Sequence, residues 1–215
     1  MTNAPAIRFG SASWFWLGFV SLLLVALCCG QNASAITAQQ QNNLEQITQD
    51  SQQSYTLTEA KILAELKTNA DPDYRLQLLI KQAQLHDLYQ RYELLLSVAK
   101  EGQVLAQTLK QDSSQLLFNI MEANALNLIG KSYEALRIHQ GAASLLQGSK
   151  PEVRYFGILS LANAHMALNQ NELATKELNS IVNATDAPPM LKSKASLALA
   201  ELQMNILQYA KSLEY

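Results

Sequence analysis

One segment of the sequence recurs at a fixed spacing in the second half of the chain. The triplet Ala-Asn-Ala stands at 123–125 and again at 162–164. In both copies another Ala follows at the same distance, Ala135 after the first triplet and Ala174 after the second. A period of roughly 20 to 50 residues is typical of solenoids, in which one supersecondary unit stacks on the next.

Two weaker copies extend the array. One begins near Leu197, where Ala198 and Ala210 keep the same spacing, and the other lies upstream with Ala83 and Leu95 in those places. Each copy has two apolar segments of period 3.6 with a short polar break between them, which predicts two antiparallel amphipathic helices. Because one such hairpin cannot bury its own apolar face, several must stack. We therefore predict an all-α, antiparallel helix-pair solenoid.

The pattern resembles the tetratricopeptide repeat. Leu161-Ala162 matches a pair in the first helix of that repeat, 171–174 matches its turn and the start of its second helix, and Pro188-Pro189 matches its end. A second match lies at 130–135, with the Tyr displaced by one position. The resemblance covers roughly 79–215. It implies a right-handed superhelix that acts as an interaction scaffold, and it says little about chemistry.

Composition argues against several functions. The chain has 16 basic and 18 acidic residues without a basic cluster, so nucleic acid is not expected as a partner. Both cysteines, Cys28 and Cys29, precede residue 35, which leaves no disulfide framework and no thiolate metal site beyond it. The three histidines, His86, His139 and His165, each lack a second ligand at helical spacing, and we expect His165 to be a packing residue. No catalytic residue, metal or cofactor is predicted.

Residues 1–35 have the features of a secretory signal. Arg8 provides the positive charge, residues 14–29 form an uncharged apolar run, and Ala33-Ser34-Ala35 is a cleavage site that would leave Ile36 as the first residue. The expected location is the periplasm. The alternatives are an uncleaved inner-membrane anchor through 14–29, although this run is short against the ~20 residues that span a bilayer, and a lipoprotein acylated at either cysteine.

The remaining chain divides into two parts. Residues 36–57 form a polar, Gln-rich leader, either a flexible spacer or a polar first helix with Leu44 and Ile47 on one face. Residues 58–215 form the repeat domain, in which 133–147 is expected to be one helix. The last repeat is expected to be incomplete, stopping about two turns into its second helix, and its open apolar end could self-associate.

The resemblance also implies a partner-binding groove. In tetratricopeptide repeats the residue after the small Ala of the first helix faces the concave groove, where an Asn often bonds a peptide backbone. Gln84, Asn124 and Asn163 occupy this position in successive copies. Glu201 occupies it in the last copy if that copy is aligned through Ala200 and Ser212 rather than through Ala198 and Ala210. Asn127 lies one helical turn after Asn124 and is added to this set. The candidate groove residues are therefore Gln84, Asn124, Asn127, Asn163 and Glu201. The alternative is that they are solvated polar residues.

Two positions restrict the ligand. Relatives that clamp a peptide's C-terminal carboxylate carry Lys or Arg one turn before the groove Asn, and here Ile120 and Leu159 stand there. A carboxylate clamp is therefore not expected, and a more apolar ligand is favoured.

Two functions are compatible with these features. The first is an exported, non-catalytic scaffold that binds a protein or peptide ligand and touches the membrane only if its N-terminal segment stays uncleaved. The alternative rests on a second resemblance. A signal, a Gln-rich start and irregular helical repeats resemble the periplasmic sensory region of bacterial membrane-bound diguanylate cyclases, which implies the sensory input portion of a signalling protein. No catalytic domain follows the repeats in this sequence, so no enzymatic activity is predicted.

Overall fold

The computed structural model describes residues 36–212, with side chains as far as Met204. Within that range the chain is helical and contains no strand. The helices are α2 (Ala38–Asp50), α3 (Tyr55–Thr68), α4 (Pro72–Leu88), α5 (Tyr92–Thr108), α6 (Asp112–Leu128), α7 (Ser132–Gly141), α8 (Ala143–Gly148), α9 (Pro151–Ala167), α10 (Asn171–Asn183) and α11 (Pro189–Ser212).

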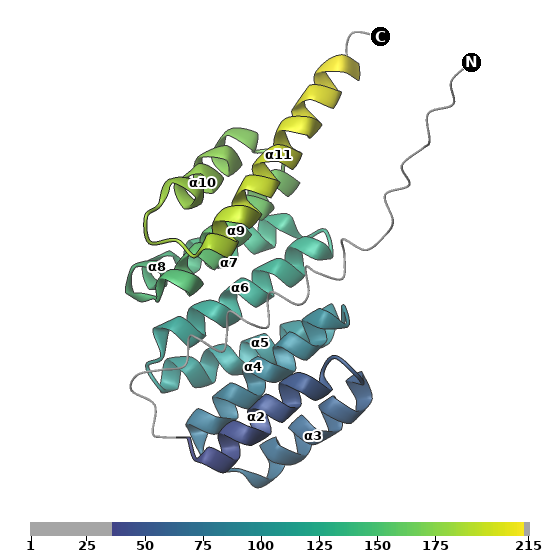
Figure 1. Ribbon diagram of the computed structural model, residues 1–215, viewed down its shortest axis with the longest axis vertical. Helices are drawn as coiled ribbons and strands as arrows, with labels where there is room; N and C mark the ends of the chain where they lie inside the picture. The colour runs from purple at the N-terminus through teal and green to yellow at the C-terminus, as the bar shows by residue number, and fades with distance from the viewer. Residues whose placement is uncertain (1–35, 213–215) are drawn as a thin grey trace, which may run out of the picture.

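The helices form a stack of antiparallel pairs, with α2 and α3 at one end and α11 at the other (Figure 1). The first helices of successive pairs, α2, α4, α6, α9 and α11, each contact the next one along the stack. Each second helix contacts its own first helix and that of the following pair. The predicted all-α helix-pair solenoid is therefore confirmed.

The small residues that define the repeat lie where the helices meet. Ala83, Ala123 and Ala162 in the first helices and Ala135 and Ala174 in the second helices are at most 1% exposed. A methyl group at these points lets two helix backbones approach closely, and larger side chains fill the space between units. The apolar core runs along the stack as clusters shared between neighbouring pairs.

Overpacking at one of these small residues tests the register of the repeat. Ala162 is fully buried in the cluster that joins α9, α10 and α11, so Ala162→Leu is expected to lower the free energy of unfolding by ~1–3 kcal/mol. Urea unfolding followed by circular dichroism measures the change. Ala167→Leu, at an exposed position of the same helix, is the control. Equal stability of the two variants would show that Ala162 is not at a helix contact.

The Gln-rich segment is part of the packed array. Of the two interpretations of 36–57, the structure shows the helix: Thr37 and Gln40 form a capping box at the start of α2. Leu44 and Ile47 are buried against residues of α3 and α4. The helical array therefore begins at α2 rather than at residue 58.

Two helix boundaries differ from the sequence expectation. The stretch 133–147 is divided at Ala142 into α7 and α8, where Gly141 weakens the helix. The last copy contains no hairpin, because α11 runs unbroken from Pro189 to Ser212. Residues 198–212 include neither Gly nor Pro, so nothing in that stretch breaks the helix. The expected second helix of the last copy is thus absent from the described part of the chain.

Candidate functional site

Three of the predicted groove residues lie together at the contact between α6 and α9. Asn124 accepts a hydrogen bond from the Ser160 hydroxyl (2.6 Å), and the Asn127 amide donates to the Asn163 backbone carbonyl (3.5 Å). Asn127 also accepts from Ser132 at the start of α7. The amides of Asn124 and Asn127 therefore join neighbouring units of the solenoid, whereas the Asn163 side chain is exposed.

The other two predicted residues lie elsewhere. Gln84 is half-buried on α4 and faces α2, where it lines a small crevice with Thr48 and Ser51. Both polar atoms of its amide are buried and have no hydrogen-bond partner among the described residues. Glu201 is exposed on α11. The structure thus does not bring all five residues to one surface.

The positions that restrict the ligand turn out to be core positions. Ile120 is fully buried and Leu159 is 7% exposed. A Lys or Arg at either place would have to bury its charge, which is unfavourable without a partner. The apolar residues there are explained by packing, independently of any ligand.

The turns between the first and second helices of a pair repeat the same geometry three times. The middle residue has a positive φ in each: Gln90 (57°), Gly130 (81°) and Asn169 (55°). The N–H of the following residue then bonds a carbonyl in the last turn of the first helix, as from Lys131 to Leu126 (2.8 Å), with the equivalent bonds at Arg91 and Gln170. This is the hydrogen bond that ends a helix in a Schellman motif.

Because the first helices run in the same direction side by side, these three turns lie along one edge of the stack. Most of the exposed large apolar side chains gather there. Seven of the twelve in the described part of the chain fall within 88–94, 128–134 and 167–173. They are Leu88, Tyr89, Leu94, Leu128, Ile129, Tyr133 and Leu173. We call this surface the turn edge.

The turns at the opposite edge of the stack lack such exposed apolar side chains. None of those twelve side chains lies in the turns at 69–71, 109–111, 149–150 or 184–188, which connect one pair to the next. At the turn edge Leu128 is 61% exposed and Tyr133 is 73% exposed. Scattered exposed apolar residues are normal on a protein, but the concentration of seven of these twelve at one edge indicates a contact surface.

A buried polar network lies beneath the contact of α6, α7 and α9. His139 Nε2 is 3.0 Å from the Ser160 hydroxyl that bonds Asn124. Burial, with a smaller contribution from nearby His165, lowers the pKa of His139 to about 4. His139 is therefore neutral at pH 7.

A second polar group joins α9 to α10. His165 contacts the Gln170 side chain through Nδ1 (2.5 Å) and the Glu177 carboxylate through Nε2 (3.3 Å). Burial raises the pKa of Glu177, and its second oxygen has no partner among the described residues. His165, which the sequence predicts to be a packing residue, also links two helices. The sequence does not show this link, because Glu177 belongs to the next helix and is not at helical spacing from His165.

The comparisons with known proteins identify no relative. No protein-family model, curated protein or solved structure matches the chain. The described residues contain no group of histidine, cysteine or acidic side chains that could hold a metal ion. No helix within residues 36–212 is long and apolar enough to cross a membrane. The predicted signal and its predicted cleavage site lie outside the described residues.

Proposed function

We propose that this protein is an exported, non-catalytic scaffold of tetratricopeptide-like helix pairs that binds an amphipathic helix of a partner protein along the turn edge. The observation that carries the proposal is the gathering of exposed large apolar side chains at that edge. Export rests on the signal-like residues 1–35.

The repeat of the turns favours a helical ligand. Packed helices lie about 8–10 Å apart, so the apolar groups of successive turns recur at about that interval. On an α-helix, residues seven apart are separated by about 10 Å along the axis and lie on nearly the same face. An amphipathic helix laid along the edge would therefore place one apolar side chain against each turn.

The turn edge is also a better docking surface than the predicted groove. The amides of Asn124 and Asn127 already have partners within the protein, so a peptide would have to displace them. Leu128 and Tyr133 have no comparable internal role, because more than half of each side chain is exposed. Covering them removes apolar surface from water at little cost to the fold.

A peptide selection tests this function. Peptides of about 20 residues, long enough to reach three turns as a helix, are selected from a random display library against the full chain, and their affinity is measured by fluorescence anisotropy. Leu128→Asp should weaken binding at least about tenfold, because it places a charge where an apolar contact is needed. Val104→Asp is the control. Val104 is exposed to a similar extent (66%) and lies on α5, outside the turn edge. Equal effects of the two substitutions would reject the turn edge as the binding surface.

A further inference from the structure

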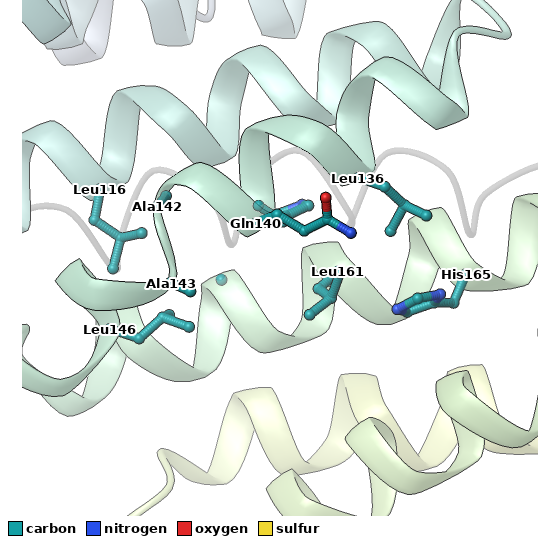
Figure 2. A pocket seen from close by; sticks show the side chains of 10 residues that line it. Leu116, Leu136, Gln140, Ala142, Ala143, Leu146, Leu161 and His165 are labelled. Atoms are coloured by element: carbon teal, nitrogen blue, oxygen red, sulfur yellow. The ribbon is translucent and has the colours of Figure 1, made fainter.

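A cavity of about 190 Å³ lies between α6, α7, α8 and α9. Figure 2 shows Leu116 and Leu146 at one end of it, and Leu136, Leu161 and His165 toward the other. It is distinct from the turn edge, and its lining contains none of the residues that define that surface.

The break between α7 and α8 shapes this cavity. In the preceding pair the second helix, α5, is unbroken from Tyr92 to Thr108, but here α7 ends at Gly141 and α8 begins at Ala143, after a turn at Ala142. On the facing helix Gly157 contributes no side chain to the space. Gln140 and Ala143 are exposed and line the cavity, so they mark its opening to solvent.

The size and lining of the cavity restrict what it can hold. An apolar cavity of roughly 150 Å³ in another protein admits benzene, so this one has room for a single ring with a substituent or for two fused rings. Its walls are mostly Leu, Ala and Gly, and its polar side chains are His139, Gln140 and His165. Because neutral His139 carries no charge, an anion would gain no ion pair from it.

The hydrogen bonds of His139 define the polar group that a ligand needs. Ser160 has one hydroxyl proton, which it donates to Asn124. In its contact with His139 the imidazole must therefore donate from Nε2, which leaves Nδ1 as a lone-pair acceptor. Both ring nitrogens of His165 already have protein partners. Because His139 lines the cavity, this acceptor favours a ligand with an O–H or N–H donor.

We propose that this cavity binds a small, neutral aromatic molecule with one hydrogen-bond donor, of the phenol or indole class. The ring would be enclosed by Leu116, Leu146 and Leu161, and its donor would bond His139. The ligand would enter past Ala143, between α7 and α8.

Nuclear magnetic resonance titration of the full chain with phenol, indole and toluene tests the proposal. Phenol and indole should produce saturable shifts of amides in α7, α8 and α9 at millimolar concentrations or below, and toluene should bind more weakly because it lacks a donor. Ala143→Phe should weaken phenol binding at least about tenfold by filling the opening. The matched control is Ala64→Phe, at an exposed position of α3 that does not line the cavity.

A substitution of His139 tests whether this residue accepts the hydrogen bond from the ligand. His139→Leu should abolish the preference for phenol over toluene, and if it does not fold, the comparison of Ala143→Phe with Ala64→Phe still tests the site. Absence of saturable shifts in the wild type, or equal loss of binding in the two Phe variants, would overturn the proposal. Toluene binding as tightly as phenol would overturn the assignment of the donor.

Discussion

Gly102→Ala is expected to lower the free energy of unfolding by about 3 kcal/mol, at the upper end of overpacking costs. A methyl group at Gly102 would stand 2.2–2.5 Å from three ring carbons of Phe118, which is fully buried on α6. Alanine is the better helix former by about 1 kcal/mol, so helix propensity alone predicts the opposite sign. The clash should dominate because the Phe118 ring is held in the core. Urea unfolding measures the difference.

Two further variants make this prediction specific. Gly141→Ala adds the same methyl group in open space at the end of α7, where it should stabilise the protein by about 0.5–1 kcal/mol. Phe118→Leu shortens the ring that meets Gly102, so Gly102→Ala should cost less in that background than in the wild type. Additive effects of the two substitutions would mean that Gly102 and Phe118 are not in contact.

His139 should make the protein sensitive to acid. Burial, with a smaller contribution from nearby His165, lowers the pKa of His139 to about 4 from an ordinary value of 6.5. Between these values the unfolded chain binds a proton that the folded protein does not. The free energy of unfolding should therefore fall as the pH drops from 6.5 to 4, by roughly 3 kcal/mol from this group.

His139→Gln isolates this contribution. The variant removes the titrating ring, so its free energy of unfolding should change less between pH 6.5 and 4 than that of the wild type. His86 should still contribute a slope of the same sign, because burial lowers its pKa, whereas the raised pKa values of Asp87 and Glu177 contribute the opposite sign. Urea unfolding at several pH values gives both profiles. Parallel profiles would show that His139 is protonated equally in the folded and unfolded states.

The repeated features of the fold could be predicted from the sequence. The Ala residues at 123, 135, 162 and 174 recur because each marks a place where two helix backbones approach, and all are buried. The spacing therefore identifies both the helix pairs and their contacts. The helix α2 is one of two alternatives that the sequence leaves open, because Leu44 and Ile47 are its only buried residues in an otherwise polar segment.

Features that depend on a single contact between distant helices could not be predicted. A Gly inside the helical pattern at 102 signals a close approach, but the sequence does not show that Phe118 is what approaches. Likewise, the repeat places Asn124 and Asn163 at equivalent positions of successive first helices. That Ser160 donates a hydrogen bond to Asn124 follows only from how α6 meets α9.

The turn edge escapes sequence reasoning for a different reason. Leu128 and Tyr133 flank Gly130, and an apolar residue beside a turn is equally compatible with a core position. Their exposure depends on how the helices on either side of the turn pack against their neighbours, which the sequence does not show. Apolar residues recurring at equivalent turns would have been a usable signal.

We propose that a partner helix lies along the turn edge. Attaching a paramagnetic label to a selected peptide, and recording which backbone amides of the full chain broaden in its nuclear magnetic resonance spectrum, locates the bound helix. Binding at the turn edge predicts broadening at 88–94, 128–134 and 167–173. Broadening centred on the opposite turns at 109–111 and 149–150, or on Asn163 at the predicted groove, would contradict it.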